Sequence, residues 1–129
     1  MLRVLIVDDC PDTAGSLRVL VRLWGHDART AGDGERALAE AAVFLPHVIL
    51  LDIGLPRLDG CEVARRLRAT PSLDRALLVA LTGYGREQDR LRAAQAGFNY
   101  FLLKPFNLDQ LEHLLQARAE SLVSESVRS

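Results

Sequence analysis

Apolar residues are grouped along the chain in short runs, and longer amphipathic stretches lie between them. Four of the runs are continuous rather than alternating, which is typical of strands that are covered on both faces of a sheet. A fifth run is shorter and more polar, as expected of an edge strand. The predicted strands are 2–7, 26–31, 47–51, 76–81 and 99–103, of which 26–31 is expected to be an edge strand.

The stretches between the strands carry apolar residues at helical spacing, with capping residues at their ends. Pro11 suits the first position of a helix, Pro46 ends another, and Asn107 can cap the last one. The fourth helix is polar nearly all round, and only Leu91 and Ala94 are expected to face inward. Because it gains little from packing, we expect it to be the most mobile element. The predicted helices are 11–24, 33–45, 59–69, 85–96 and 107–120.

Strand and helix alternate five times, which predicts a parallel sheet with right-handed crossovers and helices on both faces. Five strands suit the flavodoxin-like, doubly wound (βα)5 order 2-1-3-4-5, so the fold class is α/β. A chain of 129 residues has room for one such domain, which we place at 1–118. Residues 119–129 are expected to form the end of the last helix and a frayed polar tail.

Polar side chains follow the central strands at the edge where a doubly wound sheet places its functional site. Three carboxylates close together repel one another, so either one pKa rises strongly or a cation lies among them. With one ammonium beside them the formal charge is −2, which a single divalent ion would neutralise. Oxygen ligands with room for water and phosphate suit Mg²⁺. The set is Asp8 and Asp9 after the first strand, Asp52 after the third, Thr82 and Gly83 after the fourth, and Lys104 after the fifth.

Lys104 is the only lysine in a chain that carries fifteen arginines. An ammonium is a compact charge that can bridge a carboxylate and later a phosphoryl oxygen, whereas a guanidinium is a larger planar fork. A carboxylate such as Asp52 can act as a nucleophile toward phosphorus and form an aspartyl phosphate. Metal, ammonium and hydroxyl would then surround the oxygens on which charge develops.

Together these residues resemble the receiver domain of two-component response regulators. The resemblance covers about 1–118 and rests on LIVDD, VILLDIGLPRLDG, ALTGYG and FLLKPF in that order. It implies that Asp52 is the phosphoacceptor. It also implies that Asp9, Asp52 and the backbone carbonyl of Gly54 ligate Mg²⁺ or Mn²⁺, while Asp8 acts through metal-bound water.

The resemblance implies a switch as well. Thr82 would be the hydroxyl that turns toward the phosphoryl group, and Lys104 its cationic partner. Phe101 stands at the position of the family's switch aromatic, where many members have tyrosine. The peptide bond between Lys104 and the next proline resembles one that the family often holds in the cis form.

Other positions beside the phosphoryl site vary within the family. Gly83 and Tyr84 follow the switch hydroxyl, and Gly54 follows the phosphoacceptor by two residues. Gly54 and Tyr84 occupy the positions that tune hydrolysis of the phosphoryl group. His47 stands just before the third strand, where the family usually carries an acidic residue.

The function implied by the resemblance is that of a phosphorylated switch rather than of an enzyme. A histidine kinase or a His-phosphotransfer protein would donate the phosphoryl group to Asp52 in a Mg²⁺-dependent reaction. The face made by the fourth helix, the fifth strand and the fifth helix would then change shape and control a protein partner. At most, the domain would phosphorylate itself from small donors and lose the group slowly, and phosphorylation could drive homodimer formation.

Composition limits the partners. The net charge is −1 and no DNA-reading motif is present, so we expect no direct contact with nucleic acid. The apolar run before Asp8 is too short for a signal peptide, and no segment approaches membrane-spanning length, which predicts a cytoplasmic protein without membrane contact. Cys10 and Cys61 lack metal-ligand spacing and are expected to be free thiols.

Three alternatives were compared with the switch. A small phosphotransfer enzyme with an aspartyl intermediate would carry DxD after the first strand, but the sequence there is DDCPD and no cap domain follows. A flavin-binding electron carrier would need a phosphate cradle rich in Ser, Thr or Gly, where this loop is acidic. A receiver-like scaffold that binds partners without phosphorylation is the remaining alternative, and the intact set of polar residues argues against it.

Overall fold

The computed structural model describes residues 1–55, 58–83, 87–105 and 107–128. The strands in these ranges are β1 (Arg3–Val7), β2 (Asp27–Ala31), β3 (Val48–Asp52), β4 (Leu77–Thr82) and β5 (Tyr100–Leu103). The helices are α1 (Pro11–Leu23), α2 (Gly34–Phe44), α3 (Gly60–Arg68), α4 (Glu87–Ala96) and α5 (Leu108–Arg128). Apart from the end of α5, these bounds agree with the predicted ones to within about two residues.

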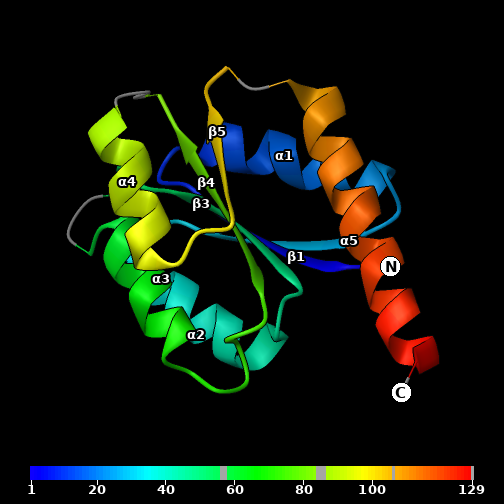
Figure 1. Ribbon diagram of the computed structural model, residues 1–129. Coiled ribbons are helices and arrows are strands. Elements are labelled where there is room, and N and C mark those ends of the chain that lie inside the picture. The colour runs from blue at the N-terminus through cyan, green and yellow to red at the C-terminus, as the bar shows by residue number, and fades with distance from the viewer. Residues whose placement is uncertain (56–57, 84–86, 106, 129) are drawn as a thin grey trace.

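The strands form one parallel sheet in the order β2-β1-β3-β4-β5, which confirms the predicted doubly wound fold. Figure 1 shows α1 and α5 on one face of the sheet and α2, α3 and α4 on the other. Neighbouring residues of β1 enter different cores: Leu5 packs with α2, α3 and α4, whereas Ile6 packs with α1 and α5. Both faces of the central strands are therefore buried, which explains their continuous apolar runs.

Side chains at the helix starts satisfy backbone N–H groups that have no partner within the helix. The carboxylate of Asp33 accepts a hydrogen bond from the Arg36 N–H at the start of α2, at 2.8 Å. The amide oxygen of Asn107 accepts from Asp109 N–H at the start of α5, also at 2.8 Å, so the predicted cap is confirmed. Cys10 makes no such bond at the start of α1.

The inward face of α4 differs from the prediction. Ala93 and Ala96 are buried, whereas Leu91 is 54 % exposed and Ala94 is exposed too. The two buried alanines are three residues apart and thus on one side of the helix. Because their side chains are small, α4 makes its apolar contact through methyl groups, and the leucine is left on the outer side.

The last helix also departs from the prediction. It continues to Arg128 instead of ending at residue 120, so the segment expected to be a polar tail is helical. Ala119 and Leu122 pack against the core beneath α5, and no glycine or proline interrupts the sequence after Pro105. Packing on one side and the lack of a helix breaker account for the longer helix. The domain boundary at 118 stays a prediction, as does the mobility of α4.

Two histidines at the amino ends of the strands accept backbone hydrogen bonds. The Leu2 N–H donates to His26 Nδ1 at 3.1 Å, and the Arg3 N–H donates to His47 Nδ1 at 2.9 Å. An imidazole accepts through Nδ1 only while that nitrogen is unprotonated. Burial lowers the pKa of both rings, and for His47 the positive charges of Arg3 and Arg118 lower it further.

These depressed pKa values predict that the domain loses stability in mild acid. The unfolded chain takes up protons at its histidines from about pH 6.5 downward, whereas the folded chain resists protonation until the pH falls below its lowered pKa values. The free energy of unfolding should therefore fall as the pH drops from 7.5 to about 5.5, measured by urea denaturation. Replacing His26 or His47 with glutamine should flatten this dependence. A dependence as steep in both variants as in the wild type would contradict the assignment.

Candidate functional site

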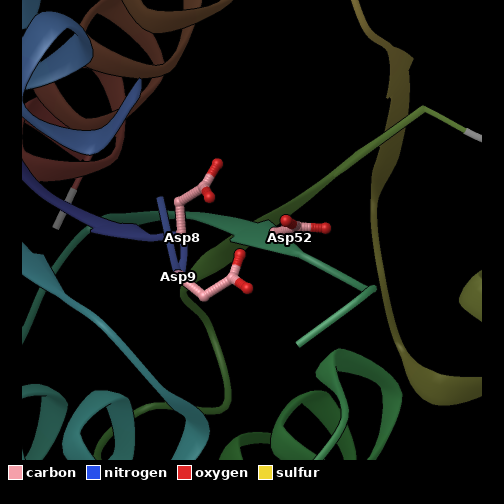
Figure 2. Close-up of side chains that lie close together, drawn as sticks. All are labelled: Asp8, Asp9 and Asp52. Carbon is pink, nitrogen blue, oxygen red and sulfur yellow. The ribbon is translucent and has the colours of Figure 1, made fainter. Parts of the chain in front are cut away.

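Three carboxylates meet beyond the carboxyl ends of β1 and β3. In the register of these strands Val7 lies beside Leu51. The next residues, Asp8 and Asp52, therefore lie at neighbouring positions along this edge of the sheet. Carboxylate oxygens of Asp8, Asp9 and Asp52 lie within 4.8 Å of one another, and Figure 2 shows the three side chains gathered at this edge. The predicted convergence of these residues is therefore present in the fold.

Asp8 is the most buried member of the cluster. It is 2 % exposed, and both of its carboxylate oxygens have partners. Oδ1 accepts a hydrogen bond from the Cys10 N–H at 2.9 Å, and Oδ2 lies 2.9 Å from Lys104 Nζ. A buried carboxylate without such partners would be strongly destabilising. The Cys10 N–H and the Lys104 ammonium therefore stabilise the Asp8 carboxylate in this position.

Lys104 bridges two carboxylates. It follows the edge strand β5, yet its Nζ lies 2.9 Å from Asp8 Oδ2 and 3.5 Å from Asp52 Oδ2. Its backbone N–H donates to the Thr82 carbonyl at 2.7 Å, and its peptide bond to Pro105 is cis, as the resemblance implied. Burial alone would lower the pKa of the ammonium, but the hydrogen bond to Asp8 and the charges of Asp52 and Asp8 outweigh it and raise the pKa.

Asp52 is more accessible than Asp8. Its Oδ1 accepts a hydrogen bond from the Gly54 N–H at 2.9 Å, while Oδ2 faces Lys104. Gly54 is exposed, and a side-chain carbon at that position would lie 3.4 Å from Asp52 Oδ1. Glycine therefore leaves one side of the Asp52 carboxylate open to an incoming group.

The remaining predicted site residues lie at the end of β4, just after it, and in β5. Thr82 is 1 % exposed at the end of β4 and lines a cavity of about 190 Å³ together with Gly54. Gly83 is exposed, and apart from its chain neighbours no atom of the described residues lies within 4 Å of where a side-chain carbon would be. Phe101 is half-buried against the core, and the Arg90 guanidinium lies 5.4 Å from its ring centroid. Tyr84 lies outside the described residues.

Sequence reasoning missed the role of Gly60, which lies at the start of the predicted helix 59–69. A side-chain carbon at Gly60 would lie 2.6 Å from the Cα of Ile53 and 2.7 Å from the carbonyl oxygen of Asp52. The first turn of α3 is therefore in contact with the backbone that carries the Asp52 side chain. Asp59 caps this helix by accepting the Glu62 N–H at 2.9 Å, and this D-G pair before a helix was the available signal.

The cluster suits a hard divalent cation. All of its candidate ligands are carboxylate oxygens, which Mg²⁺ and Mn²⁺ prefer over softer ligands. Asp9 is exposed and Asp8 is buried, so the cluster opens toward solvent on the Asp9 side and leaves positions for water and for a ligand's oxygen. With Lys104 in contact, the formal charge of −2 matches one divalent ion.

A doubly wound (βα)5 domain with three carboxylates and a lysine at this edge defines the CheY-like class. The solved structure of the Vibrio cholerae chemotaxis protein CheY4 superposes with a TM-score of 0.85 at 28 % identity, covering 91 % of this chain and 98 % of that one. A model of the response regulator receiver domain matches residues 4–116. The chain belongs to the response regulator receiver domain family.

Curated relatives agree with this assignment. The transcriptional regulatory protein PrrA of Mycobacterium tuberculosis is 39 % identical over 129 residues, which cover 96 % of this chain and 54 % of the relative. A 14.6 kDa protein of Leptolyngbya boryana is 36 % identical over 113 residues, which cover 88 % of this chain and 86 % of the relative. The chain thus spans about half of the mycobacterial regulator but most of the cyanobacterial protein.

Membership of this family sets the general function. Receiver domains are phosphoacceptor switches of two-component signalling rather than enzymes in the usual sense, and they typically bind Mg²⁺ through acidic residues. Their phosphoryl group comes from a kinase or phosphotransfer partner. Among the described residues, no helix combines the length and apolar character that spanning a bilayer requires.

Proposed function

We propose that Asp52 accepts the phosphoryl group and that the domain acts in the cytoplasm as a phosphorylation-dependent switch. The observation that supports this most directly is the Lys104 ammonium, which lies 2.9 Å from Asp8 and 3.5 Å from Asp52. The ammonium lies between the buried Asp8 carboxylate and the more accessible Asp52 carboxylate. It places a positive charge next to the oxygens that a phosphoryl group on Asp52 would bring. Asp52 is the member of the pair with an open side, next to Gly54.

In the proposed reaction, a carboxylate oxygen of Asp52 attacks the phosphorus of a phosphohistidine on the donor protein. The new O–P bond forms as the P–N bond breaks, and the departing imidazole takes up a proton. Asp9, Asp52 and the carbonyl of Gly54 would hold Mg²⁺ or Mn²⁺, with Asp8 acting through metal-bound water. When bound, such an ion would supply positive charge to the phosphoryl oxygens, and the Lys104 ammonium would add to it.

Phosphorylation would then shift the balance between two conformations. The new group brings added negative charge and acceptor oxygens to a position beside Thr82 and Lys104. The Thr82 hydroxyl would turn toward it, and Phe101 would follow and change the face made by α4, β5 and α5. Gly54 and Tyr84 would influence the lifetime of this group, and Gly83 would be a neighbour of the phosphoryl site.

This face carries features of a protein-binding surface. Its elements carry five exposed large apolar side chains among the described residues, and a cavity of about 700 Å³ lies between β5 and α5. Exposed apolar surface of this kind is common at sites of protein contact. We propose that a downstream protein, or a second phosphorylated copy, binds here. The exposed side chains are Leu91, Tyr100, Leu103, Leu108 and Val123.

Intact-protein mass spectrometry tests the proposal. Incubation with phosphoramidate or acetyl phosphate should add one phosphoryl unit to the wild-type chain when Mg²⁺ is present, and removal of Mg²⁺ with EDTA should prevent the gain. Asp52→Asn keeps the size of the side chain but removes its nucleophilic charge, so this variant should gain nothing. No gain in the wild type from either donor would favour the scaffold that works without phosphorylation. A gain in Asp52→Asn would place the phosphoacceptor elsewhere.

A further inference from the structure

A second concave site lies at the edge of the sheet opposite the acidic cluster. Here the strands begin, and a cavity of about 710 Å³ extends between β1, the segments that precede β3, β4 and β5, and the helix α5. Four arginines line it, from well-separated parts of the sequence, and Asp74 is the only carboxylate among its described lining residues. The arginines are Arg3, Arg68, Arg75 and Arg118.

The guanidiniums in this cavity form no ion pair at contact distance within the described part of the chain, although the charge of Asp74 acts on Arg68. Arg3 Nε donates to the carbonyls of Phe44 and Leu45, both at 3.0 Å, and Arg118 Nη2 donates to the Arg75 carbonyl at 2.9 Å. None of the four guanidiniums forms an ion pair with a described carboxylate, in contrast to the four arginines that pair on the outer surface of the domain. Neutral carbonyls orient these side chains without cancelling their charge.

The four arginines do not have the same role. All the nitrogens of Arg68 donate to the chain itself, to four acceptors that include the Gly97 carbonyl and Asn99 Oδ1, so it is structural. Arg118 instead has a buried Nε with no hydrogen-bond partner among the described residues. Arg75 is exposed and also lines the cavity. Arg3, Arg75 and Arg118 therefore keep N–H groups that the described part of the chain does not use.

The imidazole of His47 adds a neutral donor to this wall. Its Nδ1 accepts the Arg3 N–H at 2.9 Å, so the proton of the neutral ring is on Nε2. Burial is the main cause of the lowered pKa of this ring, and the charges of Arg3 and Arg118 lower the pKa further, which agrees with a positive potential in the cavity. The carboxyl ends of α2 and α4 each contribute about half a negative charge, which is less than the guanidiniums bring.

We propose that this cavity binds a small phosphorylated anion of nucleotide size, with its diphosphate on Arg3, Arg75 and Arg118. Guanidinium forks match phosphate oxygens in geometry and charge. The volume of about 710 Å³ is in the range of small-molecule sites. Leu45, Pro46 and Leu77 form an apolar part of the wall against which a ring can pack.

Titration of the full chain with ADP and with pyrophosphate tests this site. The titrations are followed by calorimetry and by amide NMR shifts, in EDTA so that no metal can bring phosphate to Asp52. Both compounds should bind saturably, ADP more tightly because of its ring, with shifts at residues 45–47 and 75–77. Arg75→Gln and Arg118→Gln should each weaken binding about tenfold, the loss of one charge-assisted contact. Arg36→Gln, which alters an exposed arginine on α2, and Asp52→Asn should bind as the wild type does.

Several outcomes would overturn the proposal. One is that neither compound binds saturably up to about 10 mM. Another is that Arg75→Gln and Arg118→Gln bind as tightly as the wild type, and a third is that the amide shifts are confined to residues 8–9 and 52–54. Equal affinity for ADP and pyrophosphate would reject the nucleotide part. Tighter binding of an acidic peptide would assign the cavity to a protein partner. Arg75 is exposed, so its variant tests the site even if Arg118→Gln fails to fold.

Discussion

Replacement of Lys104 with arginine is expected to slow phosphoryl transfer to Asp52 by about 100-fold or more while the domain stays folded. The ammonium lies 2.9 Å from Asp8 and 3.5 Å from Asp52, a spacing that a compact point charge fits. A guanidinium keeps the charge beside buried Asp8, so the fold is preserved. Its planar fork is wider, however, and would occupy the space that the phosphoryl oxygens need.

The rate of mass gain from phosphoramidate at saturating Mg²⁺ measures this effect, and urea denaturation checks the fold. Arg66→Lys is the matched control, because Arg66 makes a surface pair with Glu62 at 3.3 Å and lies outside the acidic cluster. That variant should react at the wild-type rate. If Lys104→Arg reacted as fast as the wild type, charge alone would suffice at this position, and the argument from the shape of the ammonium would fail.

The acidic cluster could be predicted from the sequence because parallel strands bring their carboxyl ends to one edge. Asp8, Asp52 and Thr82 each occur at the end of a continuous apolar run, so the strand positions alone placed them together. The position of Lys104 was harder to predict, because its side chain extends from the end of the edge strand β5 to the cluster at the ends of β1 and β3. The length and flexibility of its side chain allow this, and its contact with Asp8 bears out the expected convergence.

The parts that could not be predicted depend on how elements pack, not on where they begin and end. On α4 the apolar pattern is weak, and the choice between Leu91 and Ala93 for the inner side depended on how closely the helix approaches the sheet. The cavity at the opposite edge brings together Arg3, Arg75 and Arg118, whose separation along the chain gave no sign of it. Arg3 begins β1, Arg75 lies in the loop before β4, and Arg118 lies within α5, so only the packing of these elements brings the three side chains together.

Gly60→Ala is expected to destabilise the domain by about 3 kcal/mol, although alanine favours helix elsewhere. The added methyl would lie 2.6 Å from the Ile53 Cα and 2.7 Å from the Asp52 carbonyl oxygen, and both of these are backbone atoms that cannot rotate away. Either α3 moves outward or the end of β3 shifts. In the second case the Asp52 carboxylate moves relative to Lys104, so the folded fraction of the variant should also accept phosphoryl groups more slowly.

Gly15→Ala is the matched control for this change. Gly15 lies inside α1, and beyond the backbone of its own helix a side-chain carbon there would meet no atom of the described residues within 4 Å. The same substitution should therefore stabilise the domain by about 0.5 to 1 kcal/mol, because alanine loses less backbone entropy in a helix. Urea denaturation of both variants compares the effects directly. Opposite signs are required, since a loss of stability at both glycines would mean that the contact of α3 with the Asp52 backbone has no special role.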